Sequence, residues 1–303
     1  MKRRLSAVLA ALVVTATLAA CSGSATASGA APTTADPQHP VTVTVGVTDA
    51  SKDYWTTFTK LAADAGITVK LQNFTDYQQP NPILSQGQLS LNQFQHLLFL
   101  ANYNVAAKDD LVPIGATAIY QLGLYTSKGY KAPADIPDGA KIAIPNDATN
   151  QARALLVLQS AKLISLKGGG TALSTPAEID ASASRVTVVP VDATQTAVQL
   201  KSLDAAIINN NFASDAGIDP TTAIYSDLKD PKAAEPYINV WVARKKDADN
   251  PVFAQLVKIY HEATVTDELL KESKGTAIAQ DQTPAELQTI LTKLQSDITA
   301  AKG

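Results

Sequence analysis

The sequence is poor in the residues that cross-link a chain or bind metals. It has one cysteine and three histidines among its 303 residues. A single cysteine excludes an internal disulfide framework and any zinc site built from several cysteines. The three histidines, His39, His96 and His261, are scattered along the chain, which argues against a histidine-rich metal site. We therefore expect neither a metal nor a cofactor.

Charge is also scarce. Charged residues make up 17% of the chain, and 25 basic against 28 acidic residues give a formal net charge of −3. Such a balance provides no general attraction for nucleic acid, which we exclude as a partner. Hydrophobic residues make up 46% of the chain, enough to bury a core of real size and to exclude a disordered polyelectrolyte. The expected class is α/β, as one large domain or two ordinary ones.

The common catalytic motifs are missing as well. The chain has no G-x-S-x-G, no G-x-x-x-x-G-K-[ST], no H-E-x-x-H and no G-x-G-x-x-G after a strand. Gly168-Gly169-Gly170 could cradle a phosphate, but it follows a predicted helix and no Lys-Ser pair comes after it. A helix stop and loop is the better interpretation. We expect no catalytic residues and a protein that is not an enzyme.

The N-terminus has the features of an export signal. Basic residues 2–4 precede an apolar run, 5–19, which is too short to span a bilayer comfortably. The run ends in Leu18-Ala19-Ala20-Cys21, which resembles a bacterial lipobox, in which the cysteine is lipidated and becomes the first residue of the mature chain. We predict a lipoprotein signal peptide at 1–20 and lipidation at Cys21. The alternative is a plain secretory signal in which the cysteine occurs by chance.

A tether is expected after Cys21. Residues 22–40 are mostly Ser, Ala, Thr, Gly and Pro, a composition that cannot bury enough surface to fold. The predicted tether is 21–40. Acyl chains anchor stably because each buried CH₂ contributes roughly 0.8 kcal/mol. We expect a protein held at the extracytoplasmic face of the cell membrane through its N-terminal lipid only.

From residue 41 onward, strand and helix patterns alternate. The β-branched or apolar runs that predict strands are 41–47, 67–71, 111–125, 141–145, 185–190, 205–208 and 238–243. The spacing of apolar residues predicts helices at 54–65, 82–88, 91–100, 251–262, 266–271 and 284–302, and one begun by the capping residues 146–149 and running through 162. Strands separated by helices favour a mostly parallel sheet covered on both faces.

Two turn-rich stretches, 127–139 and 226–236, bracket the middle of the chain. An inserted middle segment with two connections indicates two lobes. We predict that lobe 1 comprises 41–128 and 236–303, that lobe 2 comprises 129–235, and that the lobes form a hinged clamp.

Four stretches together resemble one family. They are Phe74-Thr-Asp-Tyr-Gln-Gln-Pro-Asn81, Asn92-Gln-Phe-Gln-His96, Ile142-Ala-Ile-Pro-Asn-Asp-Ala-Thr-Asn-Gln-Ala-Arg-Ala-Leu155, and Asp204-Ala-Ala-Ile-Ile-Asn209 with Phe212-Ala213. Their order and spacing are similar to those of the NLPA lipoproteins, the substrate-binding lipoproteins of methionine ABC transporters. The resemblance covers about residues 41–300. It implies a two-lobed periplasmic-binding-protein (type II) fold with a cleft between the lobes.

The resemblance also implies a function. The chain would be a monomeric, lipid-anchored receptor that closes on an amino acid, methionine or a related small zwitterion. It would deliver this ligand to the permease and ATPase subunits of an ABC importer. Two alternatives stay open: a receptor for a short peptide or another organic anion, and a surface adhesin or sensor without a transport role.

Two residues suit the ends of an amino acid. Arg153 lies in the first turns of a predicted helix, where a guanidinium beside the helix N-terminus is a good carboxylate receptor. An exposed salt bridge is the alternative. Asn209 ends a predicted strand, where its amide can accept from an ammonium group. An Asx-turn is the alternative there. Asn210 and Asn211 compete for the same role, and only the family register prefers Asn209.

The resemblance implies that Tyr77, Phe94 and His96 surround the ligand side chain. Aromatic faces suit a thioether sulfur. From the sequence alone, Phe94 is more typical of a core and His96 of a structural histidine. The chain also departs from the family pattern in three places. Leu97-Leu98-Phe99-Leu100 lacks the family's proline and tyrosine, Tyr120-Gln121 replaces an acid and proline, and Ser90 replaces an acid. These departures keep the alternative ligands open, because polar pocket groups set specificity.

Overall fold

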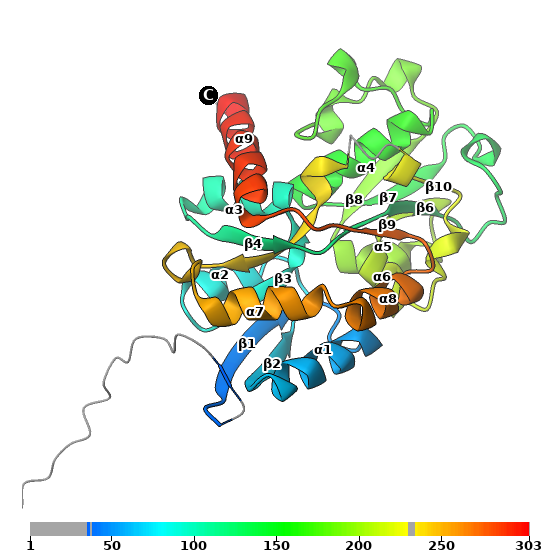
Figure 1. Cartoon of the computed structure of the whole chain (residues 1–303). Coiled ribbons are helices and arrows are strands. Elements are labelled where there is room, and N and C mark those ends of the chain that lie inside the picture. The colour runs from blue at the N-terminus through cyan, green and yellow to red at the C-terminus, as the bar shows by residue number, and fades with distance from the viewer. Residues whose placement is uncertain (1–34, 37, 230–233, 303) are drawn as a thin grey trace, which may run out of the picture. The chain divides into compact units, whose positions relative to one another are not determined.

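The computed structural model describes residues 35–36, 38–229 and 234–302 (Figure 1). The predicted signal peptide, Cys21 and most of the predicted tether lie outside these residues. No helix among those described is long and apolar enough to cross a membrane.

The first lobe is built on a five-stranded sheet in the order β2-β1-β3-β11-β4. Its strands are β1 (Val41–Val47), β2 (Ile67–Asn73), β3 (Leu91–His96), β4 (Val112–Ala116) and β11 (Asn239–Ala243). β1 is parallel to β2 and β3, whereas β11 is antiparallel to β3 and β4. β11 runs the other way because it follows directly on the chain's return from the second lobe.

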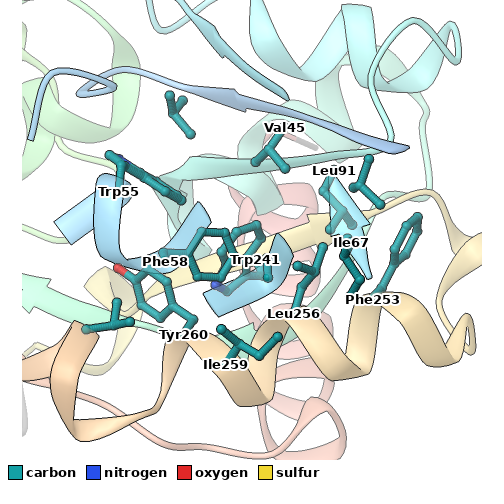
Figure 2. Packing of buried hydrophobic residues seen from close by; sticks show 14 of the residues in the cluster. Val45, Trp55, Phe58, Ile67, Leu91, Trp241, Phe253, Leu256, Ile259 and Tyr260 are labelled. Carbon is teal, nitrogen blue, oxygen red and sulfur yellow. The ribbon is translucent and has the colours of Figure 1, made fainter. Parts of the chain in front are cut away.

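Helices cover both faces of this sheet. On one face lie α1 (Asp53–Asp64), α7 (Pro251–Tyr260) and α8 (Ala263–Glu272), whose buried side chains include Trp55, Phe58 and Tyr260 packed around Trp241 (Figure 2). The other face is covered by α2 (Pro80–Ser85), α3 (Leu97–Ala107) and α9 (Pro284–Lys302). Because a close-packed core of this kind deforms little, the sheet is a rigid support for the side chains at the ends of its strands.

The second lobe is a five-stranded sheet in the order β10-β6-β9-β7-β8. Its strands are β6 (Leu122–Tyr125), β7 (Lys141–Pro145), β8 (Thr187–Val191), β9 (Ala205–Asn209) and β10 (Tyr225–Ser226). β7 is parallel to β8 and β9, while β6 is antiparallel to β9 and β10. The helix α4 (Ala148–Ser160) packs on one face, and α5 (Thr196–Gln199) and α6 (Asn210–Asp215) lie on the other.

The chain passes between the sheets twice. It leaves through β5 (Ala118–Tyr120), which pairs with β12 (Ala277–Ala279), and enters the second sheet at β6. It returns from β10 to β11, and the described part of this return contains the 3₁₀ turns Asp227–Lys229 and Glu235–Tyr237. The 3₁₀ turns of the described chain are Pro133–Asp135, Lys167–Gly169, Pro176–Glu178, Ala181–Ala183, Ala193–Gln195, Pro220–Thr222, Asp227–Lys229, Glu235–Tyr237 and Lys245–Asp247.

The two-lobed α/β fold expected from the sequence is confirmed. Each sheet is mostly parallel, as predicted: four of its strands run the same way, while β11 in the first sheet and β6 in the second run antiparallel to their neighbours. The lobe boundaries at 128/129 and 235/236 stay a prediction; β6, at Leu122–Tyr125, already belongs to the second sheet.

The predicted helix at 91–100 is wrong in its first half. Residues Leu91–His96 form the central strand β3, and the helix α3 begins only at Leu97. The strand forms because it pairs with β1 and β11, which are distant in sequence, and its buried side-chain amides find partners: Asn92 Nδ2 donates to Asn81 Oδ1 at 2.9 Å. His96 then caps the helix, since its ring Nδ1 accepts from the backbone N–H of Phe99 at 3.1 Å. This cap places His96 where the strand ends and the cavity begins.

Candidate functional site

A cavity of about 100 Å³ lies between the two lobes. A single water needs roughly 10–15 Å³ measured this way, so the cavity has room for a small molecule. All five residues predicted to bind ligand line it: Tyr77, Phe94 and His96 from the first lobe, and Arg153 and Asn209 from the second. The structure therefore brings together side chains that lie far apart in the sequence.

Arg153 projects from the second turn of α4. Asp147 caps that helix, accepting from the N–H of Asn150 at 3.0 Å, as the sequence predicts. The Arg153 side chain is only 5% exposed, and its Nε donates to Asp227 Oδ2 at 2.6 Å. Its Nη2 donates to the carbonyl oxygen of Tyr120 at 2.8 Å. The salt bridge considered as an alternative thus exists, but it is buried at the cavity wall rather than exposed.

Asn209 is held by a hydrogen-bond chain that crosses between the lobes. Its Nδ2 donates to Asn150 Oδ1 at 3.0 Å. His96 reaches the same oxygen from the first lobe, with Nε2 at 3.4 Å. Because His96 Nδ1 already accepts from Phe99, Nε2 carries the ring hydrogen and donates. Asn150 completes the chain by donating its own Nδ2 to Asp147 at 3.0 Å.

This chain leaves one acceptor unused. Asn209 Oδ1 is buried and has no hydrogen-bond partner among the described residues. Burying a carbonyl oxygen without a partner costs roughly 1–3 kcal/mol, so such an atom in a cavity wall points to a ligand donor. An ammonium group satisfies it.

The two neighbours of Asn209 also line the cavity, but they face different partners. Asn210 Nδ2 donates to Thr276 Oγ1 at 3.0 Å, across the lobes. Asn211 Oδ1 accepts from the hydroxyl of Tyr77, and its Nδ2 is buried without a partner in the described part of the chain. Asn209 therefore supplies a free acceptor, and Asn211 a free donor.

Aromatic rings form the apolar side of the cavity. Tyr77 lies 6.1 Å from Phe94 and 4.8 Å from Phe212, measured between ring centroids. Phe94 and Phe99 meet edge to face at 5.8 Å. Phe212 comes from the second lobe and packs on Tyr77 behind the cavity wall, so the lobes also meet through these rings. Aromatic faces of this kind suit an aliphatic or thioether side chain.

Burial controls the charges in the cavity wall. It lowers the pKa of His96 to about 3, with a further contribution from the nearby Arg153 cation, so the imidazole is neutral at physiological pH. Burial also raises the pKa of Asp49 and of Asp147. No group of three or more His, Cys, Asp or Glu residues able to hold a metal occurs in the part of the chain that the structure describes.

Several lining residues were not predicted. Asp49 follows β1 and accepts from Tyr54 Oη at 2.6 Å and from Trp55 Nε1 at 2.9 Å. Lys52 donates across the lobes to Ser214. Asn239 and Glu272 also line the cavity. Asp49 could have been found from its position at the carboxyl end of a strand, where ligands of α/β sheets gather; the other three carry no local signal.

A two-lobed α/β fold with a shared polar and aromatic cavity defines this chain as a substrate-binding protein. It belongs to the NlpA lipoprotein family, whose model matches residues 43–280. The family predicted from four short stretches is therefore confirmed.

Relatives and solved structures agree with this assignment. A probable D-methionine-binding lipoprotein, MetQ, of Pasteurella multocida (strain Pm70) is 34% identical over 272 residues, which cover 88% of this chain and 95% of that protein. The substrate-binding protein of a methionine transporter from Streptococcus pneumoniae has a TM-score of 0.73 and 34% identity, covering 79% of this chain and 95% of its own. A nutrient-binding protein from Burkholderia cenocepacia, solved bound to methionine, has a TM-score of 0.72 and 36% identity, with 78% and 99% covered.

Proposed function

We propose that this chain is the substrate-binding protein of an ABC importer and that it binds methionine, or a closely related amino acid, by closing its two lobes. The observation that carries the proposal is the pairing, in one cavity between the lobes, of a buried guanidinium with a buried acceptor that lacks a protein partner among the described residues. A free amino acid presents the complementary charges on adjacent atoms.

Each part of an amino acid has a partner in the cavity. The Arg153 guanidinium receives the carboxylate, since its Nη1 has no protein acceptor among the described residues. Asn209 Oδ1 receives the ammonium group. Tyr77, Phe94 and His96 surround the side chain, and the neutral His96 ring adds no charge that would oppose an apolar group. The proposed role is binding without catalysis.

Closure follows from contacts that both lobes make around the ligand. Tyr77 donates to Asn211, and Lys274 forms an ion pair with Asp219 at 2.7 Å. Ligand contacts added to these cross-lobe bonds favour the closed state, which the permease would recognise. The partners we propose are a permease and its ATPase, with the receptor acting as a monomer. Lipid at Cys21 would hold it at the extracytoplasmic face of the membrane.

A thermal-shift panel tests the ligand assignment. The purified protein is unfolded, stripped of ligand by dialysis and refolded, then heated with each amino acid in both enantiomers. Methionine is expected to raise the melting temperature most, because a ligand at about 100 times its Kd adds roughly 2.7 kcal/mol. The panel includes a methionine dipeptide and small dicarboxylates, because Phe99 and Tyr120, where the chain departs from its family, both line the cavity. If the dipeptide or a dicarboxylate raises the melting temperature and no amino acid does, the protein is a receptor for that ligand class and the proposal is wrong.

A further inference from the structure

We propose that Asp227 is a positioning residue for ligand binding, which orients the Arg153 guanidinium toward the cavity and joins it to both segments that connect the lobes. This inference rests on the proposed function, since it assumes that Arg153 receives a ligand carboxylate. Asp227 itself does not line the cavity.

Asp227 uses both carboxylate oxygens. It lies in the 3₁₀ turn Asp227–Lys229, on the segment that returns from the second sheet to the first. Its Oδ2 accepts from Arg153 Nε at 2.6 Å, and its Oδ1 accepts from the backbone N–H of Leu122 at 2.9 Å. Leu122 is the first residue of β6, on the outgoing segment. One carboxylate therefore ties together the two connections and the proposed ligand-binding cation.

The guanidinium contacts the same two segments independently. Its Nη2 donates to the carbonyl oxygen of Tyr120, at the end of the outgoing β5. Its Cζ lies 4.1 Å from the ring centroid of Tyr237, on the returning segment. Arg153 is thus enclosed by both connections. A change in their relative position on opening or closing must be accommodated at this group.

These contacts determine which donors remain for a ligand. A guanidinium has five N–H donors in a rigid planar fork, so fixing two of them fixes the rest. Asp227 takes the Nε donor and Tyr120 takes one on Nη2. The donors that remain are the two of Nη1 and one of Nη2, and their direction follows from the plane that Asp227 sets. Asp227 also neutralises a cation that would otherwise be buried without a charge partner.

Two effects of removing the carboxylate oppose each other. Loss of the negative charge strengthens the attraction of Arg153 for an anion. Loss of the geometry weakens it, because an asparagine offers one acceptor where Leu122 N–H and Arg153 Nε–H both need one, and its amide hydrogens face a donor. We expect the loss of orientation to outweigh the loss of charge. A rotated Arg153 guanidinium can no longer make two parallel hydrogen bonds to the ligand carboxylate, and these parallel bonds are what make such recognition strong.

The chain contains a matched control. Arg185 Nε donates to Asp138 at 2.7 Å, and Arg185 Nη2 donates to the carbonyl oxygen of Ile136 at 2.6 Å. This repeats the arrangement of Arg153 on Asp227 and Tyr120. The Arg185 and Asp138 side chains are 37% and 81% exposed, against 5% and 22% for Arg153 and Asp227. Neither lines the cavity, so Asp138→Asn changes the same kind of pair away from the ligand.

The test is the ratio of the Kd of methioninol to the Kd of methionine, which measures how much the ligand carboxylate contributes to binding. Isothermal titration of the stripped protein measures the Kd of methionine and of methioninol, in which a hydroxymethyl group replaces the carboxylate. For wild type the ratio is expected to be at least ~30, because loss of one partner of a buried charge pair weakens binding roughly 30- to 3,000-fold. Asp227→Asn is expected to lower that ratio about tenfold, equivalent to one charge-assisted hydrogen bond. Asp138→Asn leaves it unchanged.

The ratio separates positioning from general destabilisation, which would weaken both ligands equally. Asp227→Glu is the second variant: it keeps the charge and both oxygens but moves them by one methylene, and it too is expected to lower the ratio. An unchanged ratio in both variants makes Asp227 a structural residue and overturns the inference, while the proposed function stands. A ratio that rises in Asp227→Asn, as loss of the negative charge alone would produce, overturns it as well. If wild type binds no methionine, the proposed function fails first.

Discussion

Asn209 Nδ2 and Asn150 Oδ1 are joined by a 3.0 Å hydrogen bond that fixes which end of the Asn209 amide remains unpaired. The free end is the oxygen, because the nitrogen is committed to Asn150. His96 approaches the same Asn150 oxygen from the opposite lobe. The amide that we expect to meet the ligand ammonium is therefore oriented by a residue behind it.

Replacing Asn150 should weaken binding through Asn209. Asn150→Ser removes the acceptor for Asn209 Nδ2, so the amide can rotate and the ammonium loses its partner. Methionine binding is expected to weaken roughly ten- to hundredfold, as for a hydrogen bond to a charged group. Binding of 4-methylthiobutanoate, which lacks the amine, should change little.

Asn104→Ser is the control for Asn150. Asn104 is equally buried and donates to the carbonyl oxygen of Leu111 at 2.8 Å, away from the cavity. Calorimetric titration of both variants with both ligands decides the question. Equal losses for methionine and for the amine-free analogue in Asn150→Ser would mean that Asn150 does not act through Asn209.

His96 should make folding stability depend on pH in acid. Its folded pKa is about 3 against an ordinary value of 6.5, so between these values the unfolded chain binds a proton that the folded chain does not. Stability is full above pH 6.5 and falls as the pH drops toward 3, by up to about 1.4 kcal/mol per pH unit.

The matched variant is His96→Asn, which keeps an acceptor for the Phe99 N–H at the start of α3. Asp49 and Asp147, whose pKa values are raised, act in the opposite direction, but they are present in both proteins and cancel in the comparison. In urea unfolding, the free energy of unfolding should fall more between pH 7 and pH 4.5 for wild type than for His96→Asn. Equal losses would show that His96 is protonated in the folded state.

Membrane attachment should depend on Cys21 alone. Cys21→Ser removes the proposed acylation site, and with it the acyl chains that hold the protein at the bilayer, so the protein should move from the membrane to the soluble fraction. Detergent phase partitioning of expressed protein measures this, with Ser22→Ala as the control that keeps the cysteine. A Cys21→Ser protein that still partitions with detergent would disprove the lipid anchor.

Local signals explain which elements the sequence could predict. The β-branched run at β1 and the Asp147 cap of α4 depend only on near neighbours, and both occur as expected. The strand Leu91–His96 was missed because Leu91 and the amide residues after it run on into the leucines of α3, so that the whole stretch resembles a helix in isolation. Pairing with β1 and β11, which are distant in sequence, determines that it is a strand.

The cavity was predicted only in part for the same reason. Tyr77, Phe94 and His96 entered through family resemblance, not through any pattern of their own. Asp227 lies 74 residues from Arg153, in a turn-rich stretch where an aspartate is ordinary. Nothing in the sequence links the two. Phe212 lies in one of the family stretches, but its contact with Tyr77, like the bond from Lys52 to Ser214, is visible only in the folded chain.

Titration of methionine into Arg153→Ala is the most direct test of the account. Arg185→Ala, which removes a similarly bonded but more exposed arginine, is the control. Removing Arg153 leaves a bound carboxylate without its partner, and binding is expected to weaken by roughly 30- to 3,000-fold relative to the control. Arg153→Lys should recover only part of this loss, because an ammonium cannot reproduce the planar fork. If Arg153→Ala binds methionine as tightly as Arg185→Ala does, Arg153 does not receive the ligand carboxylate and the proposed site is wrong.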